Sequence, residues 1–226
     1  MKPNPALPLP ALGLAVTVCL LACALRAEDY KIIEAGQHYR VWQSVASAEQ
    51  KGESAAPQPS YTELATGLNW WNPQAEAWEP SVEAFELLPQ GYAVARRGQH
   101  KVMIAGNLNT GSAVDIELPD GRRMLSNPMG LSYFDVATGR NVLLAEVKDC
   151  TGELAEPNVL LFADAFDTIK AALSYTYLRG QFEQDVVIYQ DPGPPEDYGL
   201  NADTTLLEIY TEIFEAPEPV AQITGD

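Results

Sequence analysis

The stretch Ala113-Val-Asp-Ile-Glu-Leu-Pro-Asp-Gly-Arg122 reads as a short strand that runs directly into a tight turn. Pro119 presets the backbone dihedral angle that a turn requires, and Gly121 accepts a positive φ. A strand followed by such a turn is typical of a β-hairpin.

Short strands separated by turn residues continue on both sides of this stretch. Residues 131–134 and 141–148 flank the turn-forming segment 135–140 and predict a second hairpin, and two hairpins in succession indicate a meander. We therefore predict an all-β, mainly antiparallel fold, either a β-sandwich or a meander with many hairpins and little helix. Further strands are expected at residues 84–88, 92–96, 101–105, 182–188 and 204–214.

Residues 62–70 and 164–178 have patterns that differ from the short strands around them. Thr62, Leu64, Thr66, Leu68 and Trp70 alternate with other residues, which predicts one continuous strand across this segment. Residues 164–178 fit both the helical and the strand period, and the run of β-favouring residues at 174–177 favours a strand.

The first 27 residues predict a bacterial-type secretion signal. A basic Lys2 precedes an apolar run over residues 12–24, which is too short to span a bilayer as a permanent helix. Small residues predict cleavage near Ala24 or Ala27, which would release the chain to a secreted, periplasmic or cell-surface location. Residues 20–23 also resemble a lipobox, so the alternative is a protein anchored by a lipid on Cys23.

The rest of the chain divides into three parts by composition. Residues 28–60 form a short N-terminal segment and a polar, proline-containing linker. Residues 61–214 form the antiparallel β domain. Residues 215–226 have the composition of a linker or tail, and we expect the chain to be the N-terminal module of a longer protein.

The composition excludes several classes of protein. The formal net charge is −17, and removal of the signal with Lys2 and Arg26 makes it −19, so nucleic acid is not an expected partner. No second apolar segment predicts a transmembrane helix in the mature chain. Signal cleavage leaves only Cys150, which prevents an intramolecular disulfide and is expected to be a buried small apolar residue.

No catalytic residue can be named from motifs. The chain has no Gly-x-Ser-x-Gly elbow and no glycine-rich phosphate loop, and its two histidines, His38 and His100, lie too far apart for a zinc motif. We expect His100 to be an ordinary hydrogen-bonded residue at a strand edge. The alternative to a non-catalytic protein is a glycosidase that uses two carboxylates, but sequence spacing does not identify such a pair.

Aromatic residues give the candidate binding site. Trp70, Trp71 and Trp78 lie close together, and adjacent indoles on a strand face opposite ways, so one of the first two is expected to point outward. An exposed indole beside amide side chains suits a saccharide ring or a partner surface, and the alternative is that it covers a sheet edge. Asp164 and Asp167 are a weaker candidate for calcium, the one cofactor considered, because loop carboxylates suit a hard cation.

Five segments resemble a poorly characterised class of β-rich N-terminal modules in large exported bacterial proteins. They are residues 61–70, 98–101, 105–109, 130–135 and 157–164. The resemblance implies a module followed by immunoglobulin-like, lectin-like or RHS-type repeats, and it assigns no functional residue. We therefore expect a non-catalytic exported or cell-surface module with a structural or binding role, and a cell-envelope glycan or protein as its partner. The alternative is the secreted carbohydrate-active enzyme.

Overall fold

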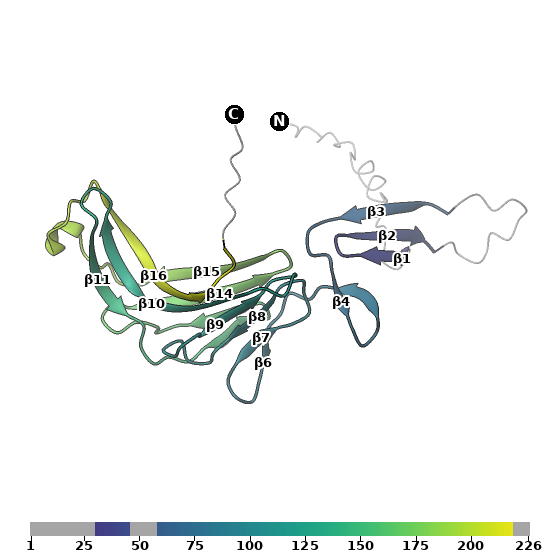
Figure 1. Ribbon diagram of the computed structural model, residues 1–226, viewed down its shortest axis with the longest axis horizontal. Helices are drawn as coiled ribbons and strands as arrows, with labels where there is room; N and C mark the ends of the chain where they lie inside the picture. The colour runs from purple at the N-terminus through teal and green to yellow at the C-terminus, as the bar shows by residue number, and fades with distance from the viewer. Residues whose placement is uncertain (1–29, 46–57, 219–226) are drawn as a thin grey trace, which may run out of the picture.

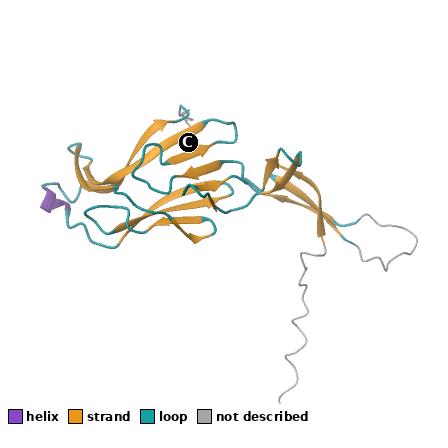
Figure 2. Ribbon diagram, turned by 90° about the horizontal axis from the view of Figure 1, so that it is seen from below, coloured by secondary structure: helices purple, strands orange, loops and turns teal. Residues whose placement is uncertain are grey.

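The computed structural model describes residues 30–45 and 58–218, and within these ranges the fold is all-β and antiparallel (Figures 1 and 2). The predicted signal, Cys23, most of the predicted linker and residues 219–226 lie outside the described residues. One short 3₁₀ helix, η2 (Pro195–Tyr198), interrupts the strands. In the part of the chain that is described, no helix has the length and apolar character needed to cross a membrane.

The larger sheet has seven strands and is organised around the long strand β10 (Arg123–Asp135). One edge of β10 pairs with β16 (Thr205–Glu215), while the other pairs first with β9 (Val114–Glu117) and then with β11 (Arg140–Glu146). The sheet continues from β9 through β8 (Lys101–Ile104), β7 (Ala93–Ala95) and β6 (Glu86–Leu87).

A four-stranded sheet packs against this larger sheet. Its order is β12 (Glu153–Glu156), β13 (Val159–Phe162), β14 (Ala171–Leu178) and β15 (Gln181–Ile188). Fully buried side chains from both sheets, including Ile104, Phe162 and Tyr175, belong to one apolar cluster. The two sheets therefore form a β-sandwich, because their inner faces share a core.

A smaller unit lies at one end of the sandwich (Figure 1). It consists of a three-stranded sheet, β1 (Tyr30–Gly36), β2 (Tyr39–Ser44) and β3 (Ser60–Leu64), followed by the hairpin of β4 (Asn69–Asn72) and β5 (Ala77–Pro80). Nearly all side chains of β1, β2 and β3 are exposed or half-buried. This sheet has little apolar core of its own, so its attachment depends on polar contacts.

The two predicted hairpins are confirmed. The amide of Leu118 donates to the carbonyl of Arg122 across the turn, and Gly121 has φ of 83°. β10 and β11 form the second hairpin, with Asp135 paired to Arg140. The turn chemistry read from the sequence was sufficient here because both hairpins are local.

The prediction of one strand from Thr62 to Trp70 is wrong. β3 ends at Leu64, and the chain turns at Gly67, which has φ of 72°, before β4 begins at Asn69. β3 pairs with β2, so the N-terminal sheet extends past the predicted boundary at residue 61. The positive φ at Gly67 ends the strand, although the alternation continues in the sequence. The alternation alone therefore did not indicate this turn.

The ambiguous segment 164–178 is a strand only in its second half. β14 starts at Ala171, and residues 164–170 form turns that bury Ala165, Phe166 and Ile169. The apolar residues at helical spacing therefore belong to a buried loop that packs into the core.

Candidate functional site

A cleft of about 650 Å³ lies between the β4–β5 hairpin and the sandwich, and we call it the tryptophan cleft. It brings together all three tryptophans predicted as a binding site, Trp70, Trp71 and Trp78. Its other walls include residues 96–99 from the β7–β8 connection, Lys101 at the start of β8, and residues 117–119 at the end of β9 and just after it.

The β4–β5 hairpin positions the indoles. Trp71 pairs directly with Trp78 across the two strands, and their rings meet edge to face with centroids 5.5 Å apart. Trp71 is 48% exposed, whereas Trp70 is half-buried. The expectation that one of the adjacent indoles points outward is therefore confirmed, and Trp71 is that residue.

The turn of this hairpin is held by Asn72. Its Oδ1 accepts hydrogen bonds from the amides of Gln74 and Ala75, and its Nδ2 donates to Glu79 at 2.8 Å. These bonds fix the loop without a glycine, although Glu76 adopts φ of 48°. The indoles thus stand on a defined hairpin.

Gln99 joins the hairpin to the opposite wall of the cleft. Its Nε2 donates to the carbonyls of Gln37 at 2.7 Å and Asn69 at 3.1 Å, and its Oε1 accepts from the Gln37 side chain. One side chain therefore ties the β7–β8 connection to the N-terminal sheet and to β4. The two walls of the cleft are held at a fixed separation.

Tyr177 holds the same connection from the core side. Its hydroxyl donates to the carbonyl of His100 at 2.8 Å, and a Cβ on Gly98 would clash with that hydroxyl. Burial raises the pKa of Tyr177 to about 12, so it remains a neutral hydrogen-bond donor at physiological pH. Gly98 is needed here for close approach of the backbone.

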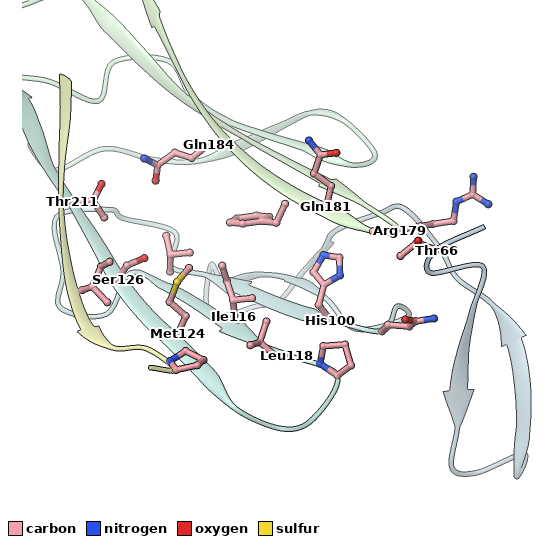
Figure 3. A pocket seen from close by; sticks show the side chains of 17 residues that line it. Thr66, His100, Ile116, Leu118, Met124, Ser126, Arg179, Gln181, Gln184 and Thr211 are labelled. Carbon is pink, nitrogen blue, oxygen red and sulfur yellow. The ribbon is translucent and has the colours of Figure 1, made fainter. Parts of the chain in front are cut away.

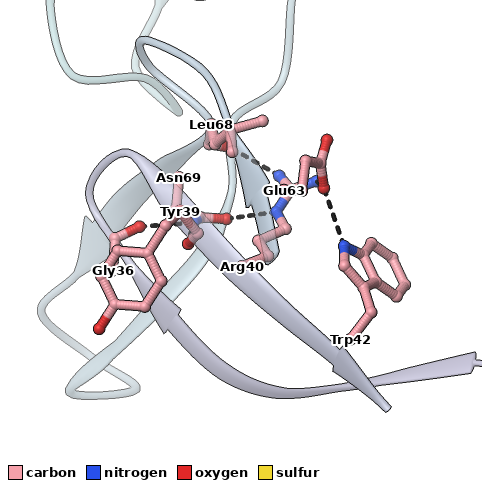
Figure 4. A network of polar contacts seen from close by, with 7 residues as sticks. All are labelled: Gly36, Tyr39, Arg40, Trp42, Glu63, Leu68 and Asn69. Carbon is pink, nitrogen blue, oxygen red and sulfur yellow. Dashed lines mark hydrogen bonds and ion pairs between the residues drawn. The ribbon is translucent and has the colours of Figure 1, made fainter. Parts of the chain in front are cut away.

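A buried polar network anchors the N-terminal sheet beside the cleft (Figure 4). Asn69 is 1% exposed, and its Nδ2 donates to the carbonyls of Gly36 at 2.6 Å and Tyr39 at 3.0 Å. Its Oδ1 accepts from Nε of Arg40 at 2.8 Å, and Arg40 also donates to the carbonyl of Leu68. The Asn69 side chain therefore bonds to three residues of the β1–β2 hairpin.

Charged groups in the tryptophan cleft are arranged in pairs. Arg97 lies 3.5 Å from Glu86, and Lys101 lies 2.6 Å from Glu117. Arg96 adds a further cation to the lining. The cleft thus presents indole faces together with guanidinium, carboxylate and amide groups that bind hydroxyls.

Glu86 and Glu117 are the two carboxylates that line the tryptophan cleft. Their side chains are 48% and 42% exposed, and each pairs with a cation. A glycosidase holds its general acid in an apolar pocket, and neither of these partly exposed side chains lies in one.

The two carboxylates predicted to bind calcium have other partners. Asp164 accepts a hydrogen bond from Nζ of Lys148 at 2.7 Å. Asp167 accepts from the amides of Glu146 and Thr168, and these bonds, with that from Glu146 the strongest, lower the pKa of its carboxyl. Among the residues that the structure places, no three His, Cys, Asp or Glu side chains are grouped so that they could hold a metal ion.

The predictions made from the sequence for Cys150 and His100 agree with the structure to different degrees. Cys150 packs against the core but is half-buried where a buried residue was expected, and burial raises the pKa of its thiol. The prediction for His100 is wrong in part, because its Nε2 is enclosed without a hydrogen-bond partner and its ring packs 4.8 Å from Tyr177. Burial lowers the pKa of His100.

No family model, curated protein or solved structure matches this chain.

Sequence reasoning missed the polar half of the cleft. Gln99, Arg96, Arg97 and Lys101 come from a connection about 25 residues beyond the tryptophans. The adjacent arginines Arg96 and Arg97 stand out in a strongly acidic chain, but residues 122–123 form a second such pair, so this signal does not single out the segment. It did not indicate that the segment faces the indoles, because that contact is tertiary.

Proposed function

We propose that this chain is a non-catalytic module of an exported or cell-surface protein, and that it binds a cell-envelope glycan in the tryptophan cleft. The observation that carries this proposal is the meeting of three indoles with amide and guanidinium groups in one cleft of about 650 Å³. Sugar rings stack their apolar C–H faces on aromatic rings and offer hydroxyls to polar side chains.

Trp71 is the most exposed indole of the cleft. A side chain that is 48% exposed has apolar area to lose on binding. The Gln99 bonds and the Asn72 turn keep the two walls in place before the ligand arrives, which lowers the entropy cost of binding.

The direct test is a glycan array followed by titration calorimetry with the best ligand. We expect Trp71→Ala to weaken binding by about tenfold or more, because a stacked aromatic ring contributes on the order of 1–3 kcal/mol. Trp42→Ala is the matched control, since Trp42 stacks on Tyr61 in the N-terminal sheet and does not line the cleft. Equal affinity of wild type and Trp71→Ala would refute the assignment of this cleft.

The alternative is a secreted carbohydrate-active enzyme that uses two carboxylates, for which the cleft offers Glu86 and Glu117. Chromatography of oligosaccharides incubated with the protein distinguishes the two functions, because a binding module leaves them intact. Turnover that disappears in Glu86→Gln or Glu117→Gln while binding persists would establish the enzyme.

We further propose export, from the pattern of residues 1–27, and membership of the class of N-terminal modules that the sequence resembles. Mass spectrometry of the exported protein tests the processing. A mature chain that starts at residue 25 or 28 supports a freed protein, and one that starts at a diacylated Cys23 supports a lipid anchor. An intact N-terminus on a protein retained in the cytoplasm would contradict export.

A further inference from the structure

The sandwich is open along one side, where a second cavity of about 550 Å³ lies between the two sheets (Figure 3). We call it the interlayer groove. Its apolar lining comes from β9, β10, β15 and β16, and includes Val114, Ile116, Met124, Phe182 and Ile213. The groove shares Gln99, Leu118 and Pro119 with the tryptophan cleft, but it differs in chemistry because no carboxylate lines it.

Two strand edges without partners border this groove. Among the described strands, β15 pairs only with β14, and β16 pairs only with β10. Exposed strand edges accept further strands, because their N–H and C=O groups have no protein partner.

The backbone of β15 has a defined set of free groups. The amide of Tyr189 donates to the carbonyl of Lys170, which continues the register of β14 and β15. Hydrogen-bonded pairs alternate along an antiparallel ladder, so odd-numbered residues of β15 bond to β14. The N–H and C=O groups of Phe182, Gln184 and Val186 therefore face the free edge.

Side chains around the groove alternate in character. Phe182 and Val186 on β15, and Ile209 on β16, pack toward the apolar core. The residues between them on the same strands, including Glu183, Asp185, Glu208 and Glu212, are acidic and lie on the opposite faces. The groove is mainly apolar, although Arg179, Gln181 and Gln184 also line it, and carboxylates lie on the outer faces of the strands that border it.

We propose that the interlayer groove binds an extended polypeptide segment of a partner protein, which adds as a strand to the free edge of β15. The segment carries apolar side chains at alternate positions, directed into the groove, and basic side chains between them, directed toward the acidic border. Strand addition supplies affinity through main-chain hydrogen bonds, and pockets for alternate side chains supply specificity.

Charge selects this partner over a second copy of the chain. Two copies, each with a formal charge of −17, repel one another, and their acidic borders would meet. The same negative charge attracts a segment that carries basic side chains between its apolar ones.

The probe is a fluorescent eight-residue peptide in which lysine and valine alternate, titrated against the full chain and followed by anisotropy. The matched controls are a peptide of the same composition with four lysines followed by four valines, and the alternating peptide N-methylated at every second residue. N-methylation removes the donors needed for pairing and keeps the side chains. We expect each control to bind about tenfold more weakly or worse, because several hydrogen bonds or buried valines are lost.

A pair of protein variants locates the site. Ile213 lines the groove, whereas Phe214, the extra residue at a β-bulge of β16, does not line it, and the two have similar exposure of 58% and 50%. We expect Ile213→Asn to weaken binding of the alternating peptide by about fivefold or more, and Phe214→Asn to leave it within about twofold. Both positions are exposed, so neither change is expected to unfold the sandwich.

Selective binding of the alternating, unmethylated peptide that is lost in Ile213→Asn supports the proposal. Equal binding of the N-methylated peptide would overturn strand addition. Absence of measurable binding at millimolar peptide, or equal effects of the two protein variants, would overturn the site. Glycan binding at Trp71 is measured separately, so failure of one proposal does not decide the other.

Discussion

Asn69→Ala is expected to release the N-terminal sheet while the sandwich stays folded. The substitution removes two hydrogen bonds to backbone carbonyls, at 2.6 and 3.0 Å, and one from the guanidinium of Arg40, at 2.8 Å. The two neutral bonds contribute about 1 kcal/mol each and the charge-assisted bond about 1.5–3 kcal/mol, so the sheet loses roughly 3.5–5 kcal/mol.

The loss is expected to be local because β1, β2 and β3 bury few apolar side chains, whereas β13 and β14 carry the core. Hydrogen exchange followed by mass spectrometry measures each region separately. Protection of residues 30–44 and 60–64 should fall by roughly two to four orders of magnitude, because 1.36 kcal/mol corresponds to a factor of ten. Exchange in residues 171–178 should remain as in the wild type.

Asn72→Ala is the matched control. Asn72 lies on the same strand and also makes side-chain hydrogen bonds, but these close the β4–β5 turn and do not reach the N-terminal sheet. If protection of β1–β3 in Asn69→Ala stays within about threefold of the wild type, the network does not hold the sheet and the reasoning is refuted.

Three further predictions concern the sandwich. Phe162→Ala should lower the free energy of unfolding by about 3–5 kcal/mol in urea, because Phe162 is fully buried between the sheets; a loss below 1 kcal/mol would show that the site collapses freely. Burial lowers the pKa of His100 below its ordinary 6.5, so the folded state favours the neutral ring. The stability that comes from the neutral ring is present above pH 6.5, and it is lost as the pH falls through the lowered pKa of the folded state. The melting temperature should therefore fall less on acidification from pH 7 to 5 in His100→Gln than in the wild type, and identical profiles would contradict this. EDTA should leave the melting temperature unchanged, because Asp164 and Asp167 already have protein partners. A melting temperature that rises with added calcium, and does not rise in Asp164→Asn or Asp167→Asn, would contradict this.

Local features of the fold were predictable from the sequence. The turn at Pro119–Arg122 and the hairpin around Asp135–Arg140 depend on residues adjacent in the chain, and both formed as expected. The segment near Gly67 was misjudged because its alternation continues through a turn that the backbone conformation of a single glycine decides.

Half of the candidate site could also be predicted from the sequence. Trp70, Trp71 and Trp78 lie close together in the chain, and strand pairing brings Trp71 and Trp78 into contact. The other half required the tertiary structure, because Gln99 reaches residues 62 and 30 positions away along the chain to close the cleft. Sequence spacing carries no information about such a contact.

The sequence by itself determined the all-β class, the acidic charge and the local hairpins, because turn residues, side-chain alternation and ionisable groups act over a few residues. Only the tertiary structure decided which strand edges remain free, which carboxylates pair with cations and which walls face the indoles. Those outcomes depend on how two sheets pack, and packing joins residues through space with no fixed relation to their separation in the chain.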